Sequence, residues 1–591
     1  MTSTERTAVL VAGGGLVGLS TALFLEHHGV PYVLVERREH ASVLPRSRGV
    51  HTRTMEMFRQ VGVERRVEQV GAKALRAGVF GGARQGATIA SATRLDLGKL
   101  RAAMANAAAS PSGFCFAPQV LLEPALADVL RERGGDVHFG TELTDFTVHE
   151  RGVVAQVRDN QGESSIHADY LIAADGANSP IRQRLGIDGW TLRPRTHYIN
   201  AFARVDLTGV LGGESFSQCD IRNDRVNCLI LAKNNTDEWT FHIEYDPERE
   251  SPADFSDERC VDLIRAAIGI SDIAVEVLAK SAWDTGVFVA RDYRRGPVFL
   301  VGDAAHRHSP WGGFGANTGI ADAHNLVWKI ASVLAGTAGP ALLHSYTAER
   351  QPQAFVAAEQ AYLGEDFATR YGIATENNAD ELARQLDFGV VMSQFRYAST
   401  AVFDSAASRW PAWSHSAASS GHVAQPPVLD SAASRWPAWS HSVASSGHVA
   451  QPPVFGGESA GHVPELTGQV GTRVPHLWID AEERVSTLDL PATGFALLVA
   501  GPADEWRDAA AAARQETGIE ISVDQLPVES WCARTELPAG GALLVRPDMI
   551  VAARSDRGLD PSSLPSVLRV ITGLGAKEER SEADPVAARS A

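Results

Sequence analysis

A glycine-rich turn between an apolar strand and a helix restricts the fold of this chain more than any other feature. Residues 13–18 (GGGLVG) follow the apolar run 7–12 and open a helix-length segment, 16–28, which a second apolar run, 32–36, follows. A strand, a glycine turn, a helix and a strand in this order predict a βαβ unit. Such units build parallel sheets with right-handed crossovers, so the chain is expected to start as an α/β domain.

The same turn predicts a bound dinucleotide, because it fits the spacing G-x-G-x-x-G. Its first glycine permits a tight turn, the second lets the backbone approach a pyrophosphate, and the third allows close helix packing. An acid ends the next strand, where a carboxylate can accept hydrogen bonds from both ribose hydroxyls. A plain glycine-rich turn would not explain that acid. The predicted contacts are Gly13, Gly15, Leu16, Val17, Gly18 and Glu36.

Length, composition and charge limit the remaining possibilities. A chain of 591 residues is too long for one core, and about two to four domains are expected. With 44% hydrophobic and 21% charged residues, the composition is that of a globular protein. The formal charge of -17 repels phosphate backbones and anionic lipid, so we expect neither a nucleic-acid nor a membrane partner.

The chain shows no sign of export. The apolar stretch 9–25 is interrupted by four glycines and has no basic segment before it, which argues against a signal peptide and against a spanning helix. A cytoplasmic protein is therefore expected. The five cysteines are scattered, with no C-x-x-C pair, so we expect reduced thiols and no metal site.

Two later strands also run into glycine-bearing turns. The run 170–174 precedes Asp175-Gly176, and the run 298–301 precedes Gly302-Asp303. Between them, residues near 195–285 alternate in polarity and are rich in β-branched and aromatic residues. This pattern predicts an antiparallel sheet inserted between elements of the nucleotide site.

A tandem duplication interrupts the C-terminal third of the chain. The segment that begins at Asp404 recurs from Asp430, 26 residues later, with one difference, Ala417 against Val443. It is rich in Ser, Ala, Gly and Pro, so we interpret it as a linker or surface insertion; a lid that docks through its paired tryptophans is the alternative. Residues 485–554 then predict a separate small α/β domain.

Residues 175–182 (DGANSPIR) and 302–306 (GDAAH), together with the first glycine turn, mark a known family. The chain resembles the class A flavoprotein monooxygenases, or para-hydroxybenzoate hydroxylase superfamily, and most closely its branch of aromatic polyketide hydroxylases, which includes the aklavinone hydroxylases. The resemblance covers residues 7–400 and resumes at 471–575.

The resemblance implies an α/β fold with a Rossmann-like FAD-binding domain, an interleaved antiparallel-sheet substrate domain and a C-terminal thioredoxin-like domain. The latter reads VAGPAD at 499–504 where a redox thioredoxin carries C-x-x-C, so disulfide exchange is excluded there. The implied boundaries are 1–75, 100–190 and 285–400 for the FAD domain, 76–99 and 191–284 for the substrate domain, 401–470 for the linker, 471–575 for the thioredoxin-like domain and 576–591 for a disordered tail.

The family's motifs also carry cofactor contacts over to this sequence. Two of these motifs are an arginine loop that follows Glu36 and a glutamine that reaches the ribityl and phosphate region of FAD. The others are two turns that each carry an aspartate, and a loop that wraps the isoalloxazine. In this last loop, Trp311 replaces a residue that is usually smaller. From the residues alone, the alternatives are a solvated loop for the arginines, which their place after Glu36 makes the less favoured interpretation, and helix N-caps for the aspartates. The implied contacts are Arg37, Arg46, Arg48, Gln119, Asp175, Gly302, Asp303, Pro310, Gly313, Gly315, Ala316 and Asn317.

By the same resemblance, NADPH is a transient co-substrate that reduces FAD, and O₂ forms a flavin C4a-hydroperoxide that hydroxylates an aromatic polyketide in antibiotic or other secondary-metabolite biosynthesis. Baeyer–Villiger insertion, epoxidation, oxidative decarboxylation and antibiotic inactivation fit the same motifs, and a flavin-bound binding module without turnover is the non-enzyme alternative. A monomer or a homodimer is expected.

No residue is identified as the catalytic base from the sequence. His306 and His308 invite an acid–base role, but a packing histidine is the commoner case. The candidates that lie in the middle sheet or the helices after it are Arg222, His242, Tyr245, Arg370 and Tyr397, although a structural role is the commoner one for each. Phe216, Trp239 and Trp283 are candidates for the walls of a flat substrate pocket, but aromatic residues at strand spacing are more often part of the core.

Overall fold

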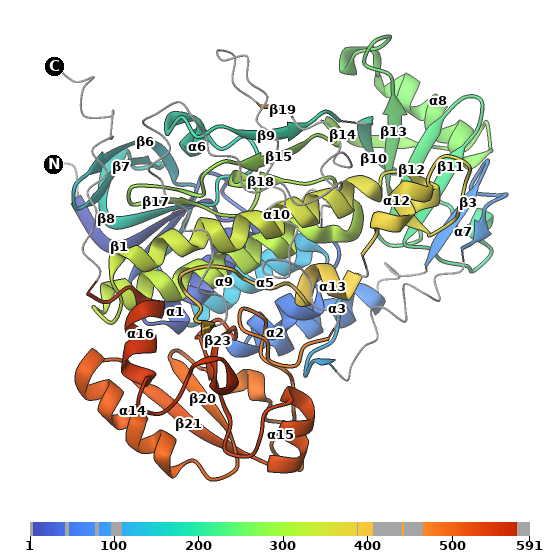
Figure 1. The fold of residues 1–591 in the computed structure, drawn as a ribbon. Coiled ribbons are helices and arrows are strands. Elements are labelled where there is room, and N and C mark those ends of the chain that lie inside the picture. Colours follow the sequence, from blue (N-terminus) through green and yellow to red (C-terminus); the bar gives the residue numbers. More distant parts are fainter. Residues whose placement is uncertain are drawn as a thin grey trace.

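The structure is a computed structural model, and it describes residues 4–41, 47–76, 82–95, 109–194, 196–386, 388–405, 440–441 and 465–575. Arg46, most of the tandem duplication and the predicted tail 576–591 lie outside these residues. The described chain forms a parallel sheet with its helices, a second large sheet beside it, and a C-terminal domain below both (Figure 1). The predicted α/β fold class is confirmed.

The first domain is built on an eight-stranded sheet with the order β16-β17-β8-β1-β2-β5, to which β7 and β6 are added beside β8. The strands β17, β8, β1, β2 and β5 are parallel, as the βαβ pattern predicts. All five residues of β2 are buried, because helices cover both faces of a parallel sheet. The bounds are β1 Thr4–Ala12, β2 Tyr32–Glu36, β5 Val137–Phe139, β6 Glu142–His149, β7 Gly152–Arg158, β8 Glu163–Ala173, β16 Arg294–Arg295 and β17 Val298–Leu300.

Two largely buried helices, α1 (Leu16–His27) and α9 (Phe314–Leu334), pack against each other beside this sheet. Nine of the 12 residues of α1 and 15 of the 21 residues of α9 are buried, which explains why α1 is apolar on all sides. The other helices of this part are α2 Thr52–Gln60, α3 Glu64–Arg76, α5 Gln119–Glu132, α6 Pro180–Arg184, α10 Ser345–Leu363, α11 Phe367–Arg370, α12 Ala379–Arg384 and α13 Phe388–Ser393, with 3₁₀ turns at Gly302–Ala304, Trp311–Gly313 and Pro340–His344.

The second sheet has seven strands in the order β14-β10-β13-β12-β11-β3-β4. Its pairs are antiparallel as predicted, except that β3 joins β11 in parallel, because it comes from a distant segment of the chain. α8 packs on one face. The bounds are β3 Ala83–Gly86, β4 Thr93–Arg94, β10 His197–Arg204, β11 Gln218–Arg222, β12 Asn227–Ala232, β13 Glu238–Tyr245, β14 Glu276–Asp284, α7 Thr208–Leu211, the 3₁₀ turn Pro252–Asp254 and α8 Asp257–Ile268.

A small sheet joins the duplicated segment to the first domain. It has the order β18-β15-β9-β19, with bounds β9 Gly189–Leu192, β15 Val287–Ala290, β18 His306–Arg307 and β19 Ser440–His441. β19 lies in the second copy of the duplication, and Ser440 pairs with Thr191 of β9. The rest of the two copies from residue 406 on lies outside the described residues, so the linker interpretation stays a prediction.

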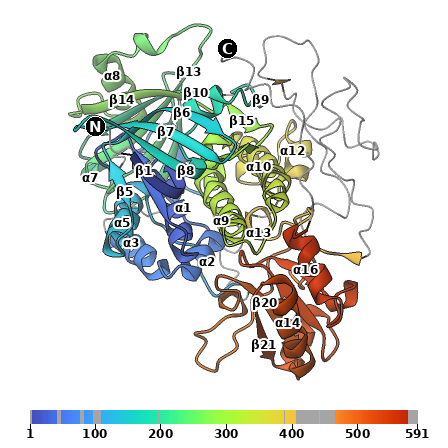
Figure 2. The same ribbon diagram turned by 90° about the vertical axis from the view of Figure 1, so that its left-hand side faces the viewer.

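The C-terminal domain has a four-stranded mixed sheet with the order β21-β20-β22-β23. β20 and β21 are parallel and the other pairs antiparallel. In both views this domain lies on the side of α2 and α9, away from the seven-stranded sheet (Figure 2). The bounds are β20 Phe495–Ala500, α14 Asp504–Thr517, β21 Ile521–Leu526, α15 Val528–Thr535, β22 Ala542–Val545, β23 Val551–Arg554, α16 Leu564–Thr572 and the 3₁₀ turns Thr487–Asp489 and Ser555–Arg557.

All five cysteines are free thiols, three of them buried. Within the described ranges, no helix combines the length and the apolar character that a membrane crossing requires.

Candidate cofactor and substrate site

The four predicted nucleotide motifs meet at one edge of the first sheet. β1 runs into Gly13, β2 ends at Glu36, β8 runs into Asp175 and β17 runs into Gly302. These strands are neighbours in the order β17-β8-β1-β2 and are parallel, so their carboxyl ends lie side by side. The carboxyl edge of a doubly wound sheet is where such folds bind ligands.

The glycines of the first turn serve two different purposes. A Cβ on Gly18 would lie 1.8 Å from the Gly13 oxygen, and one on Gly13 would lie 2.3 Å from the Ala174 oxygen, so the fold itself requires both. A Cβ on Gly15 would meet only a carboxylate oxygen at 3.6 Å, and one on Gly315 only a carboxylate oxygen at 4.0 Å. Packing inside the protein does not require these two glycines. The space beside them suits the close approach of a cofactor.

Glu36 is held in place by the turn that it faces. Its Oε2 accepts a hydrogen bond from the Gly14 amide at 2.7 Å, and its Oε1 accepts bonds from the Arg38 amide at 3.0 Å and the Arg38 guanidinium at 2.8 Å. Burial alone would raise the pKa of Glu36, but these hydrogen bonds outweigh it and the pKa is lowered. Glu36 is therefore an oriented anion at neutral pH. Arg38, which the sequence did not single out, holds it, whereas the predicted Arg37 is exposed.

Glu123 is a second acid at the glycine turn that sequence reasoning missed. It is fully buried on α5, and its Oε1 accepts hydrogen bonds from the Leu16 amide at 3.0 Å and from the Gln119 side chain at 2.6 Å. A carboxylate at the start of α1 interacts favourably with the helix dipole. Glu123 lies four residues after Gln119 and so on the same helix face, and this spacing was the sequence feature that could have indicated Glu123. Gln119 in turn accepts a hydrogen bond from the Ser47 amide at 3.3 Å.

Val17 joins three of the motifs. A Cβ on Gly302 would lie 2.9 Å from a Val17 methyl group, and one on Gly319 would lie 2.7 Å from the same methyl group and 2.7 Å from the Gly302 Cα. The second turn of α9, the Gly302 turn and the start of α1 are thus in contact. The Gly302 amide also donates to Asp322 of α9 at 3.1 Å.

Asp175 lies in the turn after β8, partly as a helix cap. Its Oδ2 accepts a hydrogen bond from the Ile181 amide at 3.1 Å, and its Oδ1 is buried without a hydrogen-bond partner in the described part of the chain. Burial raises the pKa of this carboxyl group. A buried oxygen without a partner, next to the first glycine turn, can accept a hydrogen bond from a bound ligand.

Asn317 ties together the loop expected around the isoalloxazine. Its Oδ1 accepts hydrogen bonds from the His51 amide at 2.9 Å and the Thr54 hydroxyl at 2.7 Å, and its Nδ2 donates to the Gly49 and Gly313 oxygens. The side chain is fully used within the protein. The predicted cofactor contact of Asn317 is therefore limited to its backbone. Pro310, Gly313 and Ala316 lie in the same loop and the first turn of α9.

Arg48 connects the first domain to the second sheet. Its guanidinium donates to the Ser217 and Ala232 oxygens, at 2.7 Å each, and burial lowers its pKa to about 10. The group is still a cation at neutral pH, but it is directed at the strands β11 and β12 and not at a phosphate. The sequence resemblance did not anticipate this, because the pairing depends on how the two sheets dock.

One face of the seven-stranded sheet is apolar and the other polar. Strand alternation sends Ile199, Ala201, Phe241 and Ile243 into the core under α8. On the opposite face, one register row crosses the sheet from Asp220 through Leu229, His242 and Asn200 to Ser281. Tyr198 and Trp283 stack on this face with ring centroids 4.6 Å apart.

Several buried polar atoms of this face lack hydrogen-bond partners among the described residues: both ring nitrogens of His242, Oδ2 of Asp220, Oδ1 of Asn200 and Nε1 of Trp283. Burial lowers the pKa of His242 to about 3, so its imidazole is neutral, and burial raises the pKa of Asp220. Buried polar groups normally have partners, so such a cluster indicates a site for a polar ligand.

Arg370 lies across this face from the helical side. Its guanidinium is 3.7 Å from the centre of the Trp311 ring, and its Nη2 is 3.7 Å from Asp220 Oδ1. Its Nε and Nη1 have no hydrogen-bond partner within the described ranges. Trp311 belongs to the loop expected around the isoalloxazine, so Arg370 joins that loop to the polar face.

The other candidates do not share this position. Tyr245 lies three residues from His242 on β13 and therefore on the opposite, apolar face, where it packs against Phe255 at 5.5 Å. Tyr397 is buried near the C-terminal domain. Arg222 lies two residues from Asp220 on β11 and so on the same face, but it is exposed at the end of the strand. We do not assign these three to the ligand site. Of the expected aromatic walls, Phe216 and Trp239 are fully buried core residues, and only Trp283 lies on the polar face.

His306 is a buried packing histidine with an acidic partner. Its Nε2 donates to Asp322 Oδ2 at 2.6 Å, and its ring stacks on His308 at 4.7 Å. The described residues contain no group of three His, Cys, Asp or Glu side chains suited to a metal ion.

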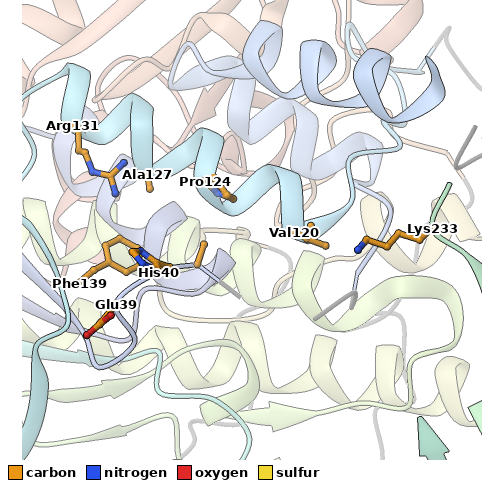
Figure 3. A pocket seen from close by; sticks show the side chains of 9 residues that line it. Glu39, His40, Val120, Pro124, Ala127, Arg131, Phe139 and Lys233 are labelled. Carbon is orange, nitrogen blue, oxygen red and sulfur yellow. The ribbon is translucent and has the colours of Figure 1, made fainter. Parts of the chain in front are cut away.

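A cavity of 390 Å³ lies beside the carboxyl end of β2 (Figure 3). Phe139, one of its walls, pairs with Glu36 in the sheet register. The lining is apolar in its centre and basic at Arg131 and Lys233. The lining residues are Glu39, His40, Ala41, Val120, Pro124, Ala127, Arg131, Phe139 and Lys233.

Comparisons with known proteins agree with this geometry. The FAD binding domain family matches residues 6–361, and the family of aromatic-ring hydroxylase C-terminal domains matches residues 467–574. A putative polyketide hydroxylase of Streptomyces halstedii is 36% identical over 97% of this chain and 98% of its own length. The tetracenomycin A2 monooxygenase-dioxygenase of Streptomyces glaucescens is 35% identical over 94% of each chain.

Solved structures show the same similarity over the whole chain. The aklavinone-11 hydroxylase in a ternary complex with FAD and aklavinone has a TM-score of 0.76 and 30% identity, covering 97% of this chain and all of that one. The rebeccamycin biosynthetic enzyme RebC with reduced flavin has a TM-score of 0.73 and 27% identity, covering 97% of this chain and 99% of that one.

Proposed function

The chain belongs to the FAD-dependent aromatic-ring hydroxylases, and we propose that it uses NADPH and O₂ to hydroxylate an aromatic polyketide in the biosynthesis of an antibiotic or related metabolite. It is a flavin-dependent monooxygenase. In the proposed reaction one oxygen atom of O₂ replaces a ring C–H with C–OH, the other leaves as water, and NADPH with one proton supplies the two electrons.

The glycine turn and its neighbours would hold the FAD. The open space at Gly15 and Gly315 suits close approach by the cofactor. Glu36 is an oriented anion that can accept hydrogen bonds from ribose hydroxyls, and a buried oxygen of Asp175 can accept a further hydrogen bond from the cofactor. The cavity beside β2 suits the adenosine end, because Phe139 lies next to Glu36 in the register. When bound, FAD supplies the electron transfer from NADPH to oxygen and the transfer of oxygen to the ring.

The polar face of the seven-stranded sheet is the main support for the proposed class of substrate. A hydroxylated polycyclic ketide is flat and apolar in its centre and carries hydroxyl and carbonyl groups at its edge. The stacked pair Tyr198 and Trp283 suits a flat ring system, and the unpartnered atoms of His242, Asp220 and Asn200 suit polar groups at its edge. Enclosure between this face and Arg370 with Trp311 would keep water away from the reacting carbon.

Arg370 would activate a phenolic ring. A phenol reacts faster with an electrophilic oxygen once it has lost its proton, and a guanidinium close to the phenol oxygen favours the anion. Burial disfavours the charged form of His242, so its neutral ring can only accept a hydrogen bond from the phenol. The carboxylate of Asp220, whose pKa burial raises, can receive the proton. Arg370, His242 and Asp220 face the same buried region, so this chain can position the ring, hold the anion and receive the proton.

The proposal is tested with purified protein in which flavin absorbance is followed anaerobically with NADPH, with and without a hydroxylated polycyclic ketide. Faster bleaching with the ketide, and an aerobic product heavier by one oxygen with an intact ring, are expected. A product with a ring-expanded lactone would show Baeyer–Villiger chemistry, and a protein that binds FAD but oxidises no NADPH with any phenol would overturn the proposal in favour of a binding module.

Two matched variants test the substrate face. Arg370→Met is expected to abolish most of the acceleration by the ketide, because it removes the cation and keeps an unbranched apolar side chain. Arg249→Met removes an arginine that lies after β13 and whose side chain is 83% exposed, and it is expected to behave as the parent protein. Equal loss in both variants, or in neither, would contradict the role of Arg370.

A further inference from the structure

Asp322 attaches α9 to the Gly302 turn. It is fully buried, and its Oδ2 accepts hydrogen bonds from the Gly302 amide at 3.1 Å and from His306 at 2.6 Å. Its Oδ1 accepts a hydrogen bond from Arg350 Nε at 2.8 Å. Three donors from two segments, residues 302–306 and α10, therefore converge on one carboxylate next to the turn.

Arg350 of α10 uses every arm of its guanidinium. It is 1% exposed, and besides Asp322 it donates from Nη1 to the Tyr397 hydroxyl at 2.8 Å and from Nη2 to the Thr318 oxygen at 3.2 Å. Thr318 belongs to the first turns of α9, directly after the loop expected around the isoalloxazine. A guanidinium is planar and rigid, so a shift of one partner moves the other two or leaves a buried donor unsatisfied.

Tyr397 is attached to the C-terminal domain by its backbone. Its amide donates to the Gly471 oxygen at 2.8 Å, and the Gly471 amide donates to Val551 of β23 at 2.8 Å. Gly471 has φ +87°, and a Cβ on it would lie 2.1 Å from the Tyr397 oxygen, so the contact requires glycine. The Tyr397 ring also lies 5.6 Å from the guanidinium of Arg546, which follows β22.

These contacts form one continuous buried path from the C-terminal domain to the edge of the FAD domain. We propose that the C-terminal domain acts as a positioning domain that holds the Gly302 turn ready for FAD through Tyr397, Arg350 and Asp322. Without the Tyr397 hydroxyl, Arg350 loses one hydrogen-bond acceptor and holds Asp322 less firmly. The Gly302 turn must then become ordered when FAD binds. Ordering a turn at that moment weakens binding. The inference rests on the proposed assignment of the Gly302 turn to the cofactor.

Titration of FAD into apo-protein, followed by flavin fluorescence, measures the effect. Tyr397→Phe keeps the ring and removes only the hydroxyl, and it is expected to raise the dissociation constant of FAD about tenfold, the size of one hydrogen bond to a charged group. Gly471→Ala, a change within the C-terminal domain, is expected to do the same. If it does not fold, Tyr397→Phe alone carries the test.

Two further variants separate the possible outcomes. Asp489→Asn weakens another contact between the domains, the ion pair with Arg59 at 2.8 Å, which does not lead to the Gly302 turn, and it is expected to bind FAD as the parent does. Asp303→Ala tests the turn itself and is expected to weaken FAD binding. If Asp303→Ala weakens binding and Tyr397→Phe does not, the path is overturned while the cofactor assignment stands. If Asp303→Ala has no effect, the assignment of the turn fails, and the inference with it.

Discussion

Replacing Glu349 by Gln should strongly destabilise the junction between α9, α10 and the C-terminal domain. Glu349 is 1% exposed, and its two carboxylate oxygens accept hydrogen bonds from Arg546 at 2.6 and 2.9 Å, from Lys329 at 2.8 Å, and from Asn325 and Ser399. With Asp548, which also pairs with Arg546, the cluster has two buried cations and two buried anions. The substitution leaves two cations and one anion.

The expected loss follows from this imbalance. Removing one partner of a buried ion pair costs about 3–5 kcal/mol, because the remaining charge has lost its partner and is still excluded from water. Deprotonation of Lys329 can remove part of this charge imbalance. Burial lowers its pKa to about 8 despite the attraction of Glu349, and without Glu349 the pKa falls further. At pH values between the lowered pKa and pH 8, Lys329 is deprotonated in the folded variant but protonated in the folded parent. The loss of unfolding free energy should therefore shrink as the pH rises, by about 1.4 kcal/mol for each pH unit.

Urea unfolding of the FAD-loaded protein, followed by tryptophan fluorescence at pH 6 and pH 8, measures both effects. Glu516→Gln is the matched control, because Glu516 pairs with Arg569 at 3.1 Å on the surface, where both side chains are about half exposed. That variant should lose no more than about 1 kcal/mol. A loss below about 1 kcal/mol in Glu349→Gln, or the same loss at both pH values, would refute the reasoning.

Three further predictions concern the turn, the buried lysine and the duplication. Gly15→Ala should fold but retain little FAD, because its Cβ would meet no protein atom closer than 3.6 Å and would fill the space assigned to the cofactor; flavin absorbance per protein measures this, and full FAD content would contradict it. The pKa of Lys329 is about 8 in the folded protein and lower than in an unfolded chain, so the free energy of unfolding should rise from pH 8 to pH 10.5. In urea unfolding, Lys329→Met should lack this rise. A rise of equal size in the variant would argue against Lys329 as its source. Deleting 404–429 should leave FAD content and turnover intact, since Asp430 would replace Asp404 as the partner of Arg396, and loss of either property would show that the segment does more than link.

Much of the cofactor site could be read from local sequence. The glycine turn, Glu36, Asp175 and Gly302 each follow a short apolar strand, and parallel strands bring their carboxyl ends to one edge. The alternation in β13 likewise predicts that His242 and Tyr245 face opposite ways. It does not say which face meets the cofactor domain, so both residues were candidates until the docking of the two sheets was known.

The partners of the long-range contacts could not be identified from the sequence. Glu123 reaches Leu16 across 107 residues, and Arg48 reaches Ala232 across 184. Arg48 and Asn317 matched family motifs for cofactor contact, yet their side chains are engaged by protein oxygens and amides. A motif records which residue type occupies a position, but the partner of a buried polar group depends on which other segments pack beside it.

The amino-acid sequence alone was enough to predict the parallel sheet, the dinucleotide turn, the inserted sheet and the duplication, because strand alternation, turn residues and repetition are local patterns along the chain. The tertiary structure alone decided the rest: which strand face becomes the polar face, and how Tyr397, Arg350 and Asp322 connect the C-terminal domain to the Gly302 turn. Periodicity and turn chemistry act locally, whereas the pairing of buried charges is selected only when distant segments exclude water together.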